Sequence, residues 1–228
     1  MSSLAFLSPG SSVTSRSPME PGAAAAGAVF EERDGWKVAV SFPDEDLSRV
    51  GFADMSHLGK LEIQGDVAAV TGHDLKRGSA LRADGAWFCP YSAQRAVVLC
   101  SPADTASLRD RLGAAAAGAP SLSSVIDTTT AQGALTIAGP LAGELFARFT
   151  ALDLRPQVTP VFGFRPGSVA RTGGAILCEA PDRYLMLFGA ALGQYVWTVV
   201  ADAAEHLGGG PVGVDALPSL DAAEAPDA

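Results

Sequence analysis

A serine, a histidine and an aspartate, the side chains of a nucleophilic triad, lie close together in the sequence at Ser56, His57 and Asp54. In such a triad the histidine accepts the serine proton and the carboxylate orients the histidine. Ser56 and His57 are adjacent, however, and adjacent residues of a strand point to opposite faces. The sequence also lacks the G-x-S-x-G turn that exposes a nucleophilic serine. We therefore interpret His57 as a turn or surface residue and predict no catalytic residue.

Other residues that could bind a ligand are spread along the chain. The histidines, His57, His73 and His206, share no spacing typical of metal ligands, so we predict no metal site. Gly59-Lys60 lacks the upstream glycine and the following Ser or Thr of a phosphate-binding loop. Three arginines near prolines could hold a carboxylate, although solvated loop arginines are the simpler interpretation. They are Arg155, Arg165 and Arg171.

The composition is that of a folded, acidic protein. The 228 residues are 48% hydrophobic, which suffices for a sizeable core, and the formal net charge is −9. Such a chain lacks the basic surface that binds nucleic-acid phosphates or anionic lipid, and no uncharged apolar run approaches a membrane span. The N-terminus has serines and prolines where a secretory signal needs a basic start and an apolar stretch. Three cysteines without a CxxC pair indicate reduced thiols, so we expect a cytoplasmic protein without nucleic-acid or membrane partners.

Apolar periodicity predicts both strands and helices. Strands are expected at 36–42, 96–100, 175–178 and 184–188. One face of the first strand would carry Trp36, Val38, Val40 and Phe42. Helices are expected to begin at Ser101-Pro102 and Gly139-Pro140 and to run from about 192 to 207. The first of these helices is expected to end at Gly113.

One seven-residue pattern occurs twice. Gly59–Gly65 and Gly133–Gly139 both read G-x-L-x-I-x-G, and an acid precedes each by a few residues, Asp54 and Asp127. In each copy the leucine and the isoleucine share one strand face, and the final glycine leads towards a helix. A strand, a helix, further strands and a helix in each half are typical of the split βαβ unit. The sequence thus predicts an α+β fold of two duplicated ferredoxin-like halves, with the two copies on paired core strands; the pattern is short, so coincidence is the alternative.

The predicted organisation has four parts. Residues 1–20 form a flexible lead, 21–118 a first α+β half, 119–218 a second α+β half and 219–228 an acidic tail. The joint between the halves lies in 113–124, where Ala, Gly, Pro and Ser dominate.

The segment 51–65, GFADMSHLGKLEIQG, resembles the G-L-x-D-x-S-x-x-G-K-x-x-V-x-G opening of the folate-binding domain in glycine-cleavage T-proteins, the aminomethyltransferases. Ile126-Asp127 followed by 135–140 is similar to that family's D-x-T…L-x-x-x-G-P. The resemblance covers about residues 17–217. It implies the fold of that domain and tetrahydrofolate as a possible ligand.

The chain also departs from the family pattern. A T-protein is longer and carries a C-terminal β-barrel, which this chain is expected to lack. The family's catalytic aspartate lies in a G-x-x-x-D-D stretch, which is compressed here into 75–88. Its R-x-G-Y-T-G-E-x-G-x-E motif, whose glutamate holds the pterin, is reduced to 171–179 without the Tyr-Thr-Gly-Glu core. The folate-binding residues that the resemblance implies are Asp54, Asp84, Arg171 and Glu179.

A short relative without the barrel is the gamma subunit of heterotetrameric sarcosine oxidase, and 210–217 is similar to the R-P-V-G-x-D-A-L ending of such chains. The resemblance implies a subunit without its own active site that docks on larger flavoprotein subunits. Flavin (FAD or FMN) and NAD would belong to those partners, which oxidise an N-methyl amine and pass the one-carbon unit to tetrahydrofolate. Large aromatics beside glycines or prolines could anchor the partner, with core packing as the alternative. They are Trp36, Phe42, Phe162 and Phe164.

Two other functions remain open on the sequence. A stand-alone tetrahydrofolate-dependent aminomethyltransferase-like protein would use the same four candidate residues. A folate-binding regulator of iron–sulfur assembly would need a reactive cysteine in a K-G-C-Y-x-G-Q motif, which this sequence lacks. We therefore favour the gamma-like subunit.

Overall fold

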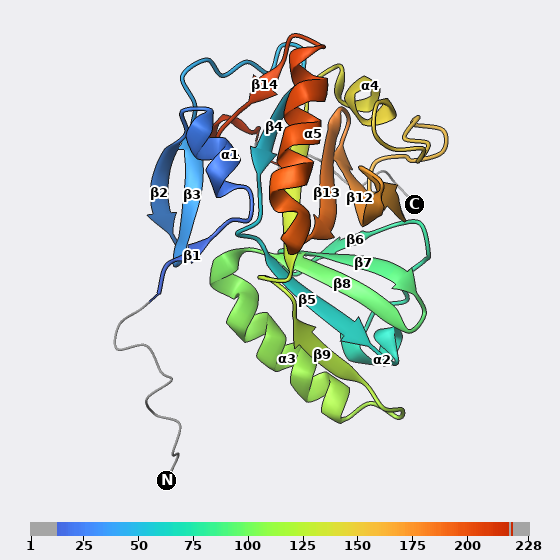
Figure 1. The fold of residues 1–228 in the computed structure, drawn as a ribbon. Helices are drawn as coiled ribbons and strands as arrows, with labels where there is room; N and C mark the ends of the chain where they lie inside the picture. The colour runs from blue at the N-terminus through green and yellow to red at the C-terminus, as the bar shows by residue number, and fades with distance from the viewer. Residues whose placement is uncertain (1–12, 219, 221–228) are drawn as a thin grey trace.

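Two β-sheets lie face to face at the centre of the structure, and helices cover the outer face of each (Figure 1). The computed structural model describes residues 13–218 and 220. Between the sheets an apolar layer joins Trp87, Val97 and Leu99 of one sheet with Leu177 and Leu187 of the other. The result is a mixed α+β fold of four layers, and its described part contains no closed barrel.

The first sheet has five strands in the order β6-β7-β8-β5-β9. They are β5 (Gly59–Gln64), β6 (Leu81–Ala83), β7 (Ala86–Ser92), β8 (Arg95–Cys100) and β9 (Ser124–Asp127). The second sheet has six strands in the order β11-β12-β13-β10-β4-β14. They are β4 (Gly51–Asp54), β10 (Gln132–Ala138), β11 (Phe164–Val169), β12 (Thr172–Ala180), β13 (Arg183–Gly189) and β14 (Gly210–Pro211). A small N-terminal sheet, ordered β1-β3-β2, consists of β1 (Ser15–Arg16), β2 (Val29–Arg33) and β3 (Trp36–Ser41).

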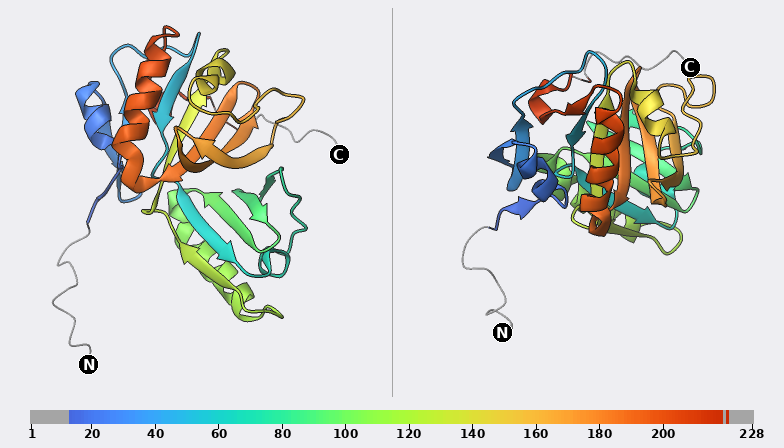
Figure 2. Two further views of the ribbon diagram at one scale, coloured as in Figure 1. Left: turned by 45° about the vertical axis from the view of Figure 1, so that its right-hand side comes forward. Right: turned by 45° about the horizontal axis from the view of Figure 1, so that its top comes forward.

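The helices pack on the outer faces because each buries one apolar stripe. On the first sheet lie α2 (Val67–Thr71) and α3 (Thr105–Ala117), the latter preceded by the 3₁₀ turn η2 (Pro102–Asp104). On the second sheet lie α4 (Ala142–Ala147) and α5 (Gly193–Glu205), with α1 (Glu20–Ala25) beside α5. Two further 3₁₀ turns are η3 (Ala190–Leu192) and η4 (Val214–Ala216). Figure 2 shows α5 along the second sheet and α3 along the first from two further sides.

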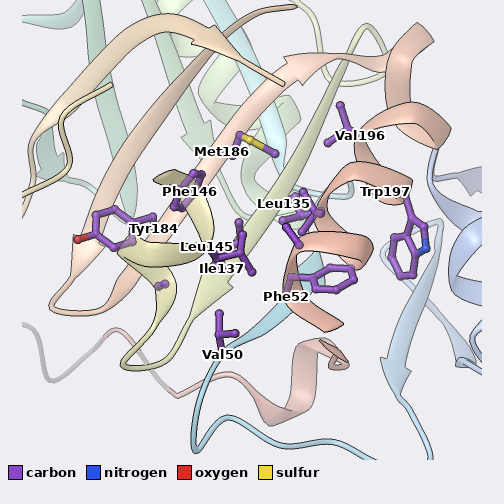
Figure 3. Packing of buried hydrophobic residues seen from close by; sticks show 14 of the residues in the cluster. Val50, Phe52, Leu135, Ile137, Leu145, Phe146, Tyr184, Met186, Val196 and Trp197 are labelled. Atoms are coloured by element: carbon purple, nitrogen blue, oxygen red, sulfur yellow. The ribbon is translucent and has the colours of Figure 1, made fainter. Parts of the chain in front are cut away.

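The largest core lies between α5 and the second sheet (Figure 3). Leu135 and Ile137 of the repeated pattern are fully buried there, and the Phe52 ring meets the edge of Trp197 at 5.0 Å between centroids. Gly22 of α1 lies directly against the Trp197 ring, since an added Cβ would come within 2.4 Å of Cδ1. The close approach of α1 to α5 therefore requires glycine at this position.

Each half of the chain gives one strand to the sheet of the other half. β4 precedes β5 in sequence but pairs with β10, with Asp54 opposite Leu135. β9 precedes β10 but pairs with β5, with Asp127 opposite Leu61. Both copies of the repeated pattern are therefore buried strands next to an exchanged strand. They lie in different sheets, so the expectation that they would pair with each other is wrong.

Most predicted elements are present, with three corrections. The helix after Ser101-Pro102 does not end at Gly113 but continues to Ala117, because alanines, which favour helix, follow the half-buried Gly113. Phe42 does not share a face with Trp36; it lies beyond β3 and stacks on Trp197 at 6.4 Å. The end of the predicted flexible lead is packed, since Met19 and Glu20 are buried, whereas Val13 is exposed and residues 1–12 lie outside the described part. Most of the predicted acidic tail also lies outside the described residues.

The aromatic residues expected to anchor a partner are mostly core residues. Trp36, Phe42 and Phe164 expose at most 9% of their surface. Phe162 is half-buried and meets the Trp87 ring edge-on at 5.0 Å. The core interpretation is therefore correct for the first three. Among the described residues, no helix is long and apolar enough to span a membrane.

Candidate functional site

An intersheet pocket of about 430 Å³ opens where strand ends of both sheets meet. We use this name for the cavity lined by Tyr91, Arg95, Gln132, Pro166, Gly167, Gly173, Gly174, Leu187, Phe188 and Gly189. Its volume is within the usual range of small-molecule sites, roughly 300–1,000 Å³. One wall comes from β7 and β8, and the opposite wall comes from β10 to β13.

Glycines keep this pocket open. At Gly173 and Gly189, an added Cβ would meet no atom within 4 Å, and neither residue has a positive φ. Gly174 also stands where the family motif carries its tyrosine, whereas Gly173 matches the glycine of that motif. The cavity therefore results from side chains that are missing along β12 and β13.

One charged pair fixes the polar wall. Arg95 donates from Nε and Nη2 to the two oxygens of buried Glu62, at 3.1 and 2.9 Å. The Arg95 guanidinium lies 4.8 Å from the Tyr91 ring centroid, which orients it further. This pairing with Arg95 lowers the pKa of Glu62, so the carboxylate stays ionised and both of its oxygens accept hydrogen bonds from Arg95.

The remaining polar groups suit binding more than catalysis. Burial raises the pKa of Tyr91 to about 12, so its hydroxyl stays protonated and can donate a hydrogen bond. Gln132 uses Nε2 to donate to Thr128 Oγ1 at 3.0 Å, which leaves its amide oxygen as an acceptor. The lining offers an aromatic ring and fixed donors and acceptors, and it contains no side chain with a pKa near neutrality. These features suit a planar, hydrogen-bonding ligand.

The structure places the four candidate folate residues at separate sites. Asp54 is buried at the end of β4, where it accepts a hydrogen bond from the Ser56 N–H at 2.9 Å. Burial raises the pKa of the Asp54 carboxyl, against hydrogen bonds from Ser17 and Ser56. Asp84 lies in the turn between β6 and β7 and pairs with Arg111 of α3 at 2.8 Å on the molecular surface.

Arg171 and Glu179 lie near opposite ends of β12. Arg171 is exposed in the two-residue turn before β12, with φ +60°, close to the intersheet pocket in the chain. Glu179 is eight residues further, which in a strand is roughly 26 Å away. It lies at a β-bulge, is buried, and accepts a hydrogen bond from Arg183 Nε at 3.0 Å. One pocket cannot contain all four candidates, and Arg171 is the candidate nearest to the intersheet pocket along the chain.

The most unusual charged residue is one that the sequence did not single out as a site. Lys60 has no exposed surface, and its Nζ donates to the carbonyls of Ser56 and Leu58 at 2.9 and 2.8 Å. The Thr129 carbonyl is 3.5 Å from the same nitrogen. Burial lowers the pKa of Lys60 to about 8, against the opposing charges of Asp54 and Asp127. Lys60 thus joins the β4–β5 loop to the β9–β10 loop.

No metal centre is formed by the part of the chain that the structure describes, because no three His, Cys, Asp or Glu side chains gather there. The three predicted arginines also hold no common site. Arg155 pairs with Asp153, and Arg165 donates to Thr159 and to the Val158 carbonyl. The three cysteines are buried and unpaired.

The free energy of unfolding should increase as the pH rises from about 4 to 6.5, because the folded chain does not bind a proton at His57. Burial, aided by the charges of Lys60 and Arg33, lowers the pKa of His57 to about 4. Between that value and the pKa of an unfolded histidine, the unfolded chain binds a proton that the folded chain does not, so stability increases with pH. Wild type should gain up to roughly 3 kcal/mol more than His57→Gln across this window.

Urea unfolding at a series of pH values measures this difference. His206→Gln is the matched control, because that side chain is 62% exposed. Parallel pH profiles of wild type and His57→Gln would show that His57 does not exclude the proton.

No protein-family model matches the chain. In sequence, the chain is 26% identical over 240 residues to an aminomethyltransferase of Frankia alni (strain DSM 45986 / CECT 9034 / ACN14a), an alignment that covers 90% of this chain and 62% of the relative. The chain thus spans less than two thirds of that curated relative.

Two solved structures share the fold. A chain of heterotetrameric sarcosine oxidase from Corynebacterium sp. U-96 matches with a TM-score of 0.69 at 18% identity, over 87% of this chain and 98% of that one. The glycine cleavage system aminomethyltransferase T from Bartonella henselae matches with a TM-score of 0.72 at 16% identity, over 89% and 60%. The resemblance predicted from the motifs is confirmed: the chain is a sequence relative of an aminomethyltransferase and has a T-protein-like α+β fold.

Proposed function

We propose that this chain is a gamma-like, non-catalytic subunit of a cytoplasmic, flavin-dependent complex that oxidises sarcosine or a related N-methyl amine in tetrahydrofolate one-carbon metabolism. The observation that carries the proposal is the match over 98% of one chain of a heterotetrameric sarcosine oxidase. The separation of Asp54, Asp84 and Glu179 supports a role without a catalytic centre of its own. Flavin and NAD would then be bound by the larger partner subunits.

The architecture that goes with this proposal is a duplicated split βαβ fold. β5 lies between β8 and the exchanged strand β9, and β10 lies between β13 and the exchanged strand β4. The two strands therefore occupy equivalent central positions in their sheets. β6, β7 and β8 would correspond to β11, β12 and β13 in the two strand orders. A cut near residue 118 would separate β9 from the sheet that precedes it, so the two halves are expected to fold only together.

Affinity purification from the native host tests the subunit proposal. The chain, tagged at its chromosomal locus and kept at native expression, should co-purify with a flavoprotein in a fixed ratio. Flavin absorbance, mass spectrometry and size-exclusion chromatography identify the partner and the ratio, with the untagged strain as control. A monodisperse monomer without flavoprotein would overturn the proposal.

A stand-alone tetrahydrofolate-dependent aminomethyltransferase-like protein is the second candidate. The sequence similarity to an aminomethyltransferase over 90% of the chain favours it. The purified chain should show no aminomethyltransferase turnover with tetrahydrofolate if the subunit proposal is correct. Turnover that Asp84→Asn or Glu179→Gln abolishes would instead assign the chain to this second class.

If tetrahydrofolate binds, the intersheet pocket is where we expect it. The pocket combines an aromatic ring, the Tyr91 hydroxyl and the Gln132 amide oxygen, which suit a flat heterocycle with several polar edges. Gly189→Leu should fill the cavity and weaken tetrahydrofolate binding at least about tenfold, without loss of fold, because the new side chain enters open space.

Isothermal titration calorimetry measures that affinity. Gly143→Leu is the matched control, since Gly143 is exposed in α4, away from the pocket, and also has open space at its Cβ. Equal affinity in both variants would place folate elsewhere.

A further inference from the structure

A second cavity lies where five separate parts of the chain meet. This junction pocket, of about 450 Å³, is bounded by β1 and the β2–β3 turn, the β4–β5 loop, the start of α3 and the β9–β10 loop. The lining residues that carry the argument are Asp34, Trp36, His57, Asp127 and Thr129. No lining residue is shared with the intersheet pocket.

Lys60 fixes two walls of the junction pocket. Its Nζ binds the carbonyls on either side of His57, those of Ser56 and Leu58. Its backbone N–H donates to Thr129 Oγ1 at 3.0 Å on the opposite wall. The Thr129 N–H in turn donates to Asp127 Oδ1 at 3.0 Å. The loops that carry His57 and Asp127 are therefore held rigidly before any ligand arrives.

His57 has unused hydrogen-bonding capacity in this pocket. Its side chain is mostly buried and lines the cavity, yet no described residue forms a hydrogen bond with the imidazole. A pKa of about 4 makes the ring neutral at physiological pH, so one nitrogen is an acceptor. The imidazole, which no described residue engages, is therefore available to hydrogen-bond a ligand that enters the cavity.

The charges around the cavity favour a cation. Asp34 and Asp127 are both on the rim, and no described residue donates a hydrogen bond to the Asp34 carboxylate. Two positive charges lie nearby. That of Arg33 is balanced by Glu31 and Asp215, and that of Lys60 is shared among backbone carbonyls. The Trp36 indole adds an aromatic wall, against which an organic cation is attracted.

We propose that the junction pocket binds a small organic ammonium ion, held by Asp34 and Asp127 against Trp36 with His57 as acceptor. A primary or secondary ammonium has donors for the two carboxylates and the imidazole, and an alkyl part for the indole. The site goes beyond the proposed subunit role and does not depend on it.

The three tryptophans make this testable in one spectrum. Trp36 lines the junction pocket, whereas Trp87 and Trp197 lie in other cores and are internal references. Titration of the ¹⁵N-labelled full chain with ethylammonium chloride should shift the Trp36 indole N–H saturably and leave the other two unchanged. Ethanol and sodium propionate, at matched ionic strength, are the neutral and anionic controls.

Asp127→Asn should weaken ethylammonium binding about tenfold, because a charge-assisted hydrogen bond is lost while the amide oxygen can still accept from the Thr129 N–H. Asp110→Asn is the matched control, as that carboxylate is 73% exposed on α3 and pairs with Arg109. A Trp36 shift caused by propionate alone, a shift that Asp127→Asn leaves unchanged, or no shift with any probe would each overturn the proposal.

Discussion

Replacing Lys60 with methionine should lower the free energy of unfolding by about 3 kcal/mol, the range found when one partner of a buried charged contact is removed. Methionine has a similar length and no donor. The carbonyls of Ser56 and Leu58 would then stay buried without their hydrogen-bond partner. Each such unsatisfied group is unfavourable by roughly 1–3 kcal/mol. The loss is therefore expected even though burial itself disfavours the charged lysine.

Urea unfolding of wild type and variant measures the change. Lys76→Met is the matched control, because Lys76 is exposed and its replacement should alter stability by less than about 0.5 kcal/mol. A loss below about 1 kcal/mol for Lys60→Met would mean that water or a backbone shift satisfies the carbonyls. Lys60 would then not be what joins the two loops.

Local patterns predicted the elements well because their causes are local. The alternation in Trp36, Val38 and Val40 does form one small cluster on β3, and the stripe beginning at Val196 does face the core. The exchange of β4 and β9 between the sheets was beyond such patterns. It is decided by pairing between residues about 80 positions apart, such as Asp54 and Leu135. The sequence of a strand does not by itself determine which strand it pairs with.

The sites were harder to predict for the same reason. Lys60, like Glu62, alternates with Leu61 and Ile63 in the strand, and this pattern by itself places it on the polar side. Its burial depends on Thr129, 69 residues later. The intersheet pocket depends on side chains that are missing at Gly173 and Gly189, and glycines in a sequence indicate turns as readily as open space.

Replacing Glu179 with alanine should lower the free energy of unfolding by about 3 kcal/mol, because the buried Arg183 would lose its carboxylate partner. Arg183 is 8% exposed and donates from Nε to Glu179 at 3.0 Å, while Nη1 donates to the Pro218 carbonyl. Arg82, which donates to the Leu220 carbonyl at 2.7 Å, also contributes to the electrostatic environment of Glu179. Without the carboxylate, positive charge would stay in the interior without compensation.

A double variant separates this structural role from ligand binding. Glu179→Leu with Arg183→Met removes both charges and should recover most of the lost stability, since replacing a whole buried pair by apolar side chains is often neutral. Asp153→Ala is the matched control for an exposed pair, for which a change below about 1 kcal/mol is expected.

Thermal and urea unfolding of the single and double variants, read with tetrahydrofolate titration, distinguish the two roles of Glu179. If the Glu179–Arg183 ion pair is structural and joins β12, β13 and the segment at Pro218, the free energy of unfolding should fall in Glu179→Ala and recover in the double variant. Affinity for any pterin should then be the same in the double variant as in wild type, because the intersheet pocket does not include Glu179. Glu179→Ala with unchanged stability and abolished folate binding would instead assign the carboxylate to the ligand, as the family resemblance implies.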